Sequence, residues 1–325
     1  MFFHYSELKR VSSLVLLFCL LTTIAAWCQE AKWPSKTLYR FAEVKGHRMF
    51  YREAGDRKNP TIILLHGYPS SSHTYREIIP LLSGRYHVIA PDNLGSGYSD
   101  KPDPALTHYT FDLLAEQVEG LLEVLDIDKY TLYIQDFGAP VGFRMMMNRP
   151  RSLQALIVQN GNAYLEGLTP KRQRFFRQAQ LDTSSKMLDK LFQITGSQSV
   201  KATQYLRDVK GREYIMSPDS WTHDNHFLEQ KQERDIQVAL FQDYKTNLDN
   251  YHLWQSFLRK HQPPTLLVWG RHDPAFLAAG AEAYLQDVSD AELHLLDAGH
   301  FAAEEKPVDI AKFIVTFLEK ISLRL

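Results

Sequence analysis

The sequence contains very little cysteine. Only Cys19 and Cys28 occur in its 325 residues, and both lie close to the N-terminus. The remainder of the chain therefore has no thiol, which excludes an internal disulfide there and any metal site built on cysteine. His223 and His226 are spaced for one helix turn, but the sequence offers no evident third ligand beside them. We therefore expect neither a metal nor another cofactor.

An excess of one charge is also missing. The chain has 37 Lys and Arg against 38 Asp and Glu, and no basic patch or charge run that would indicate nucleic-acid binding. Repeats and low-complexity segments are absent too. With 44% hydrophobic residues, the chain is suited to one large domain, or one domain with an insert. We expect a small-molecule substrate as partner, and either a monomer or a homodimer.

The longest run of mostly apolar residues is confined to the N-terminus. Lys9 and Arg10 precede a run from Val11 to Ala26, which is the layout of a secretory signal peptide. We predict a signal peptide over 1–28, with cleavage after Cys28 or, alternatively, after Ala25. The run is short for a bilayer span, so an uncleaved anchor is the less favoured alternative. The mature protein is therefore expected to be secreted or periplasmic, without a stable membrane span.

Apolar strands and amphipathic helices alternate along the rest of the chain. The pattern predicts a hairpin over 37–44 and 47–53, and buried strands at 61–65, 86–90, 130–134, 156–159, 265–269 and 292–296. Helices are expected from about residue 72, over 110–125 and 139–148, and later over 275–285 and 308–321. This alternation is typical of a mostly parallel sheet with helices on both faces.

One long segment interrupts this alternation. Between residues 161 and 264 the chain is rich in Gln, Lys, Arg and Asp, with helical periodicity and no strong buried strand. We predict a helical cap over 161–264, inserted between a first core part over 29–160 and a second over 265–325. The ligand should bind at the carboxyl ends of the strands, beneath this cap.

The stretch from Tyr130 to Arg144 is the most informative in the chain. An apolar strand is followed by Gln-Asp-Phe-Gly and then at once by a helix, which leaves no room for a loop. So sharp a strand-to-helix bend pushes its apex residue, Asp136, out of the sheet, and Gly138 lets the helix pass close to the strand. Taken alone, this stretch would favour Asp136 as a simple helix cap, and the other motifs of the chain reverse that preference.

Two further strand ends carry polar residues that a core does not require. Asp273 follows the strand predicted over 265–269, and His300 follows the one over 292–296. The chain order Asp136, Asp273, His300 is that of nucleophile, acid and histidine in a strand–nucleophile–helix enzyme. In that arrangement His300 would take a proton from water, and Asp273 would orient and stabilise its imidazolium.

From about residue 37 to its end, the chain resembles the α/β-hydrolase superfamily. The motifs are His66-Gly67-Tyr68-Pro69, the loop 91–99, the Asp136 turn and Gly299-His300. They are most similar to the branch with an aspartate nucleophile, which contains epoxide hydrolases and haloalkane dehalogenases. The resemblance implies an α/β-hydrolase fold and a covalent ester on Asp136. It also implies an oxyanion hole from the backbone N–H groups of Tyr68 and Phe137.

The choice between epoxide hydrolysis and dehalogenation depends on residues other than Asp136, Asp273 and His300. Haloalkane dehalogenases hold the halide with Trp after the nucleophile and with Asn or Trp in the first motif, where this chain has Phe137 and Tyr68. Tyr244-Lys245-Thr246-Asn247 resembles the Tyr-Arg-x-Asn cap motif of epoxide hydrolases, so Tyr244 is the expected acid. Tyr205, with Tyr214 as rival, is the expected second cap tyrosine.

Three features leave other functions open. Ile134, two residues before Asp136, is Gly in many epoxide hydrolases and branched in dehalogenases. Trp254 is an expected substrate contact or, with Trp221, an alternative halide donor. The same scaffold also serves cofactor-free, luciferase-type oxygenases and binding proteins, because a fold does not fix the chemistry. Epoxide hydrolysis is therefore the first hypothesis, with dehalogenation and oxygenation as alternatives.

Overall fold

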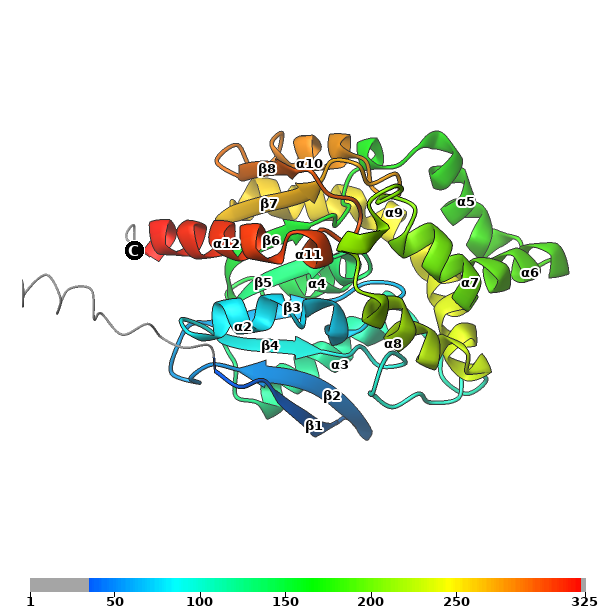
Figure 1. Ribbon diagram of the computed structural model, residues 1–325, viewed down its shortest axis with the longest axis horizontal. Helices are drawn as coiled ribbons and strands as arrows, with labels where there is room; N and C mark the ends of the chain where they lie inside the picture. The colour runs from blue at the N-terminus through cyan, green and yellow to red at the C-terminus, as the bar shows by residue number, and fades with distance from the viewer. Residues whose placement is uncertain (1–34, 323–325) are drawn as a thin grey trace, which may run out of the picture. The chain divides into compact units, whose positions relative to one another are not determined.

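The computed structural model describes residues 35–322, so the signal peptide expected over 1–28 lies outside the described part. Eight strands form one sheet in the order β1-β2-β4-β3-β5-β6-β7-β8 (Figure 1). Strands β1 and β2 pair antiparallel with their neighbours, and the other pairings are parallel. The expected mostly parallel sheet is confirmed. The strands are β1 (Leu38–Val44), β2 (His47–Ala54), β3 (Thr61–Leu65), β4 (His87–Pro91), β5 (Tyr130–Gln135), β6 (Leu153–Gln159), β7 (Thr265–Gly270) and β8 (Glu292–Leu296).

Helices cover both faces of the sheet because its strands are apolar on both sides. In β3, Ile62 and Leu64 belong to one hydrophobic cluster, whereas Ile63 and Leu65 belong to the other. Helices α2 (Ile78–Ser83) and α12 (Pro307–Ser322) pack in the first cluster, and the short α11 (Ala302–Glu305) precedes α12. Helices α3 (Phe111–Val124), α4 (Gly138–Asn148) and α10 (Ala278–Tyr284) pack in the second.

The segment between β6 and β7 contains helices and, in agreement with its polar periodicity, no strand. Figure 1 shows α5 to α8 beyond the carboxyl ends of the strands, where the sequence predicts the ligand. The regular helices are α5 (Pro170–Leu181), α6 (Ser185–Ile194), α7 (Ser197–Val200), α8 (Pro218–Leu228) and α9 (Lys231–His261). None of the helices within residues 35–322 combines the length and apolar character that a bilayer crossing requires.

Helix α9 joins this insert to the core. Its 31 residues span roughly 46 Å at 1.5 Å per residue, enough to reach from the cap to α4. Trp254 of α9 stacks on Phe143 of α4, with 4.8 Å between ring centroids and 5° between planes. Arg144 of α4 donates to Asn247 Oδ1 at 2.8 Å and to Thr246 Oγ1 at 3.1 Å, and it also binds Asp112 of α3. These contacts fix α9 on the core.

The expected element bounds differ from the structure by more than one residue at three places. Strand β6 begins at Leu153, three residues before the expected start, and only a 3₁₀ turn, Ser72–Tyr75, follows the first motif. Helix α10 begins at Ala278 and not at Ala275. In this last case, the N–H of Ala275 donates to Asp273 Oδ1 at 2.6 Å, and the carbonyl of Phe276 accepts from Trp269 Nε1 at 2.9 Å. These two bonds hold the segment as a turn before the helix starts.

The close passage of α4 over β3 gives a first testable expectation. A Cβ atom on Gly138 would lie 2.2 Å from the backbone oxygen of Leu65, which cannot yield as a side chain does. We expect Gly138→Ala to lower the free energy of unfolding by about 1–3 kcal/mol, measured by chemical denaturation. Gly196→Ala is the control, because the nearest atoms to its Cβ are at 3.3 Å and include the flexible Arg234. Equal stability of the two variants would contradict this account of the turn.

Candidate active site

Asp136 occupies the apex of the turn between β5 and α4. Strand β5 ends at Gln135 and α4 begins at Gly138, so only two residues connect them. Asp136 has a φ of 48°, in the left-handed region that residues with a Cβ adopt at an energetic cost. Its side chain lies against Gly67, where an added Cβ would come within 2.2 Å of Asp136 Cβ. Sequence and structure thus agree on a tight turn that presents a carboxylate.

The Asp136 carboxylate is buried but faces two backbone donors. The N–H of Tyr68 donates to Oδ1 at 2.7 Å, and the N–H of Phe137 lies near enough to lower the pKa of this carboxyl. Burial raises the pKa of Asp136, whereas His300 and both backbone N–H groups lower it, and the net shift is upward. Oδ2 lies 3.6 Å from His300 Nε2, beyond ordinary hydrogen-bond distance. The two N–H groups expected as an oxyanion hole therefore converge on this carboxylate.

The first motif is held in place by its neighbours. The N–H of Asn93 donates to His66 Nε2 at 3.0 Å, while His66 Nδ1 lies 3.1 Å from the carbonyl of Gly67. These contacts fit a neutral imidazole with its proton on Nδ1, and burial lowers the pKa of His66. Asp92 Oδ1 accepts from the N–H of Ser72 at 2.8 Å. The loop that carries the Tyr68 N–H is thereby positioned by the loop after β4.

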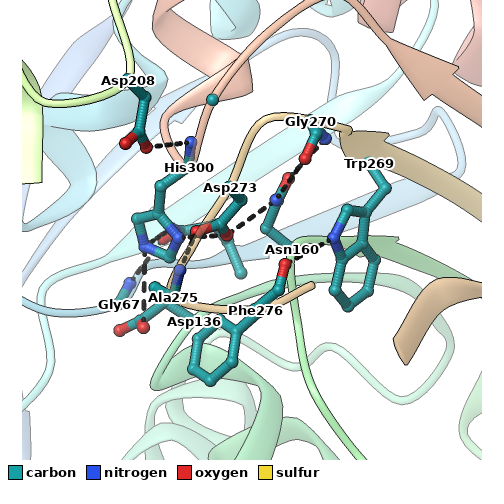
Figure 2. Close-up of polar contacts among 12 residues, drawn as sticks. Gly67, Asp136, Asn160, Asp208, Trp269, Gly270, Asp273, Ala275, Phe276 and His300 are labelled. Atoms are coloured by element: carbon teal, nitrogen blue, oxygen red, sulfur yellow. Dashed lines mark hydrogen bonds and ion pairs between the residues drawn. The ribbon is translucent and has the colours of Figure 1, made fainter. Parts of the chain in front are cut away.

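His300 and Asp273 form a buried pair beside Asp136 (Figure 2). His300 Nδ1 lies 2.7 Å from Asp273 Oδ2. Burial lowers the pKa of His300, but the charge and hydrogen bond of Asp273 and the charge of Asp136 outweigh it, so the net shift is upward. Burial raises the pKa of Asp273, yet His300 and the Ala275 N–H bring it below its usual value. Asn160, after β6, adds a hydrogen bond from Nδ2 to Asp273 Oδ2 at 2.9 Å.

Gln135, directly before Asp136, determines which nitrogen of His300 carries the proton. The N–H of Gly67 can only donate, and it donates to Gln135 Oε1 at 3.0 Å. The amide nitrogen of Gln135 must then face His300 Nε2, at 3.2 Å. Because this NH₂ group is a donor, Nε2 must offer a lone pair, so the imidazole is neutral with its proton on Nδ1, towards Asp273. His300 is therefore arranged as a base at Nε2.

The cap contacts this pair through Asp208. Asp208 Oδ2 accepts the backbone N–H of His300 at 3.1 Å, as Figure 2 shows. Arg207 binds Asp208 from Nε at 2.5 Å and from Nη2 at 3.0 Å, and its Nη2 also lies 3.9 Å from Asp273 Oδ1. The loop between the π-helical turn Lys201–Tyr205 and the 3₁₀ turn Glu213–Ile215 thereby supports the histidine loop.

Tyr244 is buried in an aromatic cluster beside Asp136. Its ring stacks on Phe176 at 3.9 Å and lies 5.6 Å from Phe137. Tyr251 lies seven residues later on the same face of α9, close enough to raise the pKa of Tyr244, and Asn162 Nδ2 donates to the Tyr251 hydroxyl at 3.0 Å. Burial raises the pKa of both phenols, that of Tyr251 to about 12 and that of Tyr244 well above its usual value. Both phenols are therefore protonated at neutral pH.

Three other aromatic residues singled out in the sequence do not take the expected places. The hydroxyl of Tyr205 donates to the buried Asp224, and its ring stacks on Phe301, so it has no free proton for a substrate. Tyr214 is 85% exposed. Trp254 is buried between α9 and α4, where it packs against Phe143, and is better described as core than as a substrate contact. The second phenol near Tyr244 is that of Tyr251.

Sequence reasoning missed Gln135, Asn160, Asp208 and Tyr251. Only Tyr251 carried a usable signal, since residues seven apart on a long helix lie on one face. Gln135 and Asn160 end strands that were recognised, but an amide at a strand end has no distinctive pattern. Within the described residues, no group of three or more His, Cys, Asp or Glu side chains is arranged to hold a metal ion.

The contact between Gln135 and His300 gives a second expectation. Gln135→Met removes a donor that favours neutral Nε2, so the pKa of His300 should rise further above its usual value. We expect the histidine titration, followed by NMR of labelled imidazole, to move to higher pH. The variant should also lose about 1–3 kcal/mol of stability, because the Gly67 N–H is left unpaired. Gln117→Met, a buried glutamine of α3, is the control, and an unchanged His300 titration in Gln135→Met would contradict the tautomer assignment.

Comparisons with known proteins agree with this geometry. The alpha/beta hydrolase fold family matches residues 60–307. An uncharacterized hydrolase of Saccharomyces cerevisiae is 38% identical over 289 residues, covering 87% of this chain and 98% of its own length. A haloalkane dehalogenase of Psychrobacter cryohalolentis is 27% identical, covering 83% and 87%. The structure of the epoxide hydrolase CorEH shares the fold, with a TM-score of 0.72, 21% identity and coverage of 88% and 100%. The chain thus belongs to the α/β-hydrolase-fold family, as a hydrolase with haloalkane dehalogenase relatives.

Proposed function

We propose that this hydrolase opens epoxides through a covalent ester on Asp136. The observation that carries the proposal is a buried carboxylate at the apex of the turn, with a neutral histidine on one side and two protonated phenols near enough for its charge to raise their pKa. A carboxylate attacks a saturated carbon directly, whereas a serine at this position would need to lose its proton first. The phenols can supply the proton that an opening oxirane requires.

In the first half of the reaction, Asp136 forms an ester with the substrate. A carboxylate oxygen attacks one ring carbon, and the bond from that carbon to the oxirane oxygen breaks. The oxygen takes the phenolic proton of Tyr244, while Tyr251 hydrogen-bonds the resulting phenolate. Tyr251 already accepts a hydrogen bond from Asn162, so its own proton is available for this role.

In the second half, water hydrolyses the ester. His300 Nε2 takes a proton from water as the water oxygen adds to the Asp136 carbonyl carbon, and Asp273 stabilises the imidazolium. The N–H groups of Tyr68 and Phe137 stabilise the tetrahedral oxyanion. The intermediate then releases the diol, which takes the proton from His300. The carboxylic acid of Asp136 restores the Tyr244 phenol, and the enzyme returns to its starting state.

The second candidate is dehalogenation, favoured by the similarity to the Psychrobacter cryohalolentis haloalkane dehalogenase. Halide release needs N–H donors from side chains near the nucleophile, and Phe137 and Tyr68 supply none. Trp254 is stacked on Phe143, and Trp221 packs near Tyr205, so neither tryptophan is associated with Asp136. The phenol pair therefore favours an epoxide oxygen over a halide as the group that leaves carbon.

The covalent step is tested by removing the base. His300→Gln keeps the attack by Asp136 but slows hydrolysis of the ester, so incubation with styrene oxide should add the mass of one epoxide to the intact protein. The adduct should map to the peptide containing Asp136 after proteolysis.

His272→Gln is the matched control, because His272 is half-exposed and pairs with Asp297 at the surface. This variant should turn over the epoxide without accumulating an adduct. No added mass on His300→Gln, despite turnover of the epoxide by the wild type, would contradict the ester. An adduct with 1-bromobutane and none with styrene oxide would favour dehalogenation.

The phenol pair gives a separate expectation. Tyr244→Phe should lower the rate of epoxide opening by about 10²–10⁴-fold, the usual contribution of a general acid. The burst of ester formation should slow, whereas hydrolysis of an ester already formed should be unaffected. Tyr251→Phe should have a smaller effect on the same step, since it acts through Tyr244. Stopped-flow fluorescence separates the two steps, and a loss confined to ester hydrolysis would contradict this assignment of Tyr244.

A further inference from the structure

Arg172 has a position that its own helix does not explain. It is the third residue of α5, where the N-cap Thr169 accepts its backbone N–H at 3.2 Å, and the first turn contains no acidic residue. The N-terminus of a helix carries partial positive charge, so a cation at this position is unfavourable by about 0.3–1 kcal/mol. The reason for a guanidinium here must therefore be sought outside α5.

The Arg172 guanidinium lies on the site side of α5. Its Cζ is 6.0 Å from the centroid of Phe176, the ring that stacks on Tyr244. The charges that act on it belong to Asp273, Arg207, Tyr244 and Asp136, all residues of the site. Within residues 35–322 its side chain makes no hydrogen bond and no ion pair. Burial lowers the pKa of Arg172 and Asp273 raises it, and an arginine remains a cation despite the net decrease.

Arg207 provides the contrast within the same site. Its guanidinium is occupied by Asp208, with contacts at 2.5 and 3.0 Å, and it lies 3.9 Å from Asp273. Arg207 thus already supplies positive charge to the acids around His300. A second, unpaired guanidinium would be repelled by the first, and Arg207 does lower the pKa of Arg172. Its five donors and its charge remain free for a ligand.

We propose that Arg172 binds a carboxylate group of the substrate, so that the preferred substrates are epoxides bearing a carboxylate. This inference rests on the proposed epoxide hydrolysis and names its substrate class. A planar guanidinium binds a carboxylate through two parallel N–H···O bonds, which fixes both distance and orientation. Because Arg172 is partly buried, such a pair is screened less than one at the protein surface. The cap then selects the substrate, and the core performs the reaction.

The test compares epoxides that differ only in charge. One pair is 3-phenylglycidate and its primary amide, and a second is 4-(oxiran-2-yl)benzoate and its amide, which places the carboxylate farther from the ring. For wild type we expect kcat/KM to be higher for the acid than for the amide in at least one pair. Arg172→Gln should lower that acid-to-amide ratio roughly 10- to 100-fold, as expected for loss of a charge-assisted hydrogen bond. The acid-to-amide ratio of Arg172→Lys should lie between those of wild type and Arg172→Gln.

Arg177→Gln is the matched control, since Arg177 lies on the same helix with an exposed side chain, and its ratio should equal that of wild type. A ratio unchanged by Arg172→Gln, with both substrates slowed equally, would show that Arg172 only balances the charge of the acids and would overturn the proposal. Wild type that hydrolyses acid and amide equally in both pairs would overturn it too, while leaving epoxide hydrolysis intact. Failure to hydrolyse any epoxide would count against the proposed function itself.

Discussion

The structure depends on one backbone constraint, the conversion of a strand into a helix across two residues. The constraint holds Asp136 at a φ of 48°, at a cost of about 1–3 kcal/mol. The surroundings offset this cost: Gly67 and Gly138 leave space where a Cβ would collide, and the Tyr68 N–H binds the carboxylate. The same contacts that make the turn tolerable are those that a reaction at the carboxylate requires. Stability and chemistry are therefore coupled at this residue.

Burial and charge act in opposite directions on the titratable groups of the site. Burial raises the pKa of Asp136, and His300 and the two backbone N–H groups act against that rise, in the direction of the ionised carboxylate that the proposed attack requires. His300 is subject to the opposite conflict, because Asp273 and Asp136 raise its pKa while the amide of Gln135 faces Nε2 as a donor. In the proposed reaction, a neutral imidazole beside an ionised carboxylate is the state in which attack and later hydrolysis follow one another without a proton shift in between.

The sequence allowed the fold, and the proximity of Asp136, Asp273 and His300, to be predicted because both depend on local patterns. Apolar runs end at Gln135, Gly270 and Leu296, and parallel strands bring their polar successors to one edge. Side chains that meet across separate elements were not predictable in this way. Tyr205 and Tyr251 are both tyrosines of the helical insert, and the sequence does not distinguish them. Their contacts do, because the Tyr205 hydroxyl donates to Asp224, whereas Tyr251 lies near Tyr244. Asp208 lies in an irregular loop, where no periodicity indicates that it faces His300.

The cap meets the rest of the protein through two helices: α9 is fixed to the core, and α5 contacts the site. Helix α9 carries both phenols and is fixed to α4 by Trp254 and by the hydrogen bonds of Arg144, so the distance from phenol to Asp136 is set by the rigid core. Helix α5 meets the site through Phe176, which packs on α9. Substitutions in α5 can therefore change which substrate is held without moving the proton donor. Under the proposed function, this division lets one arrangement of nucleophile, base and acid serve substrates that differ in charge.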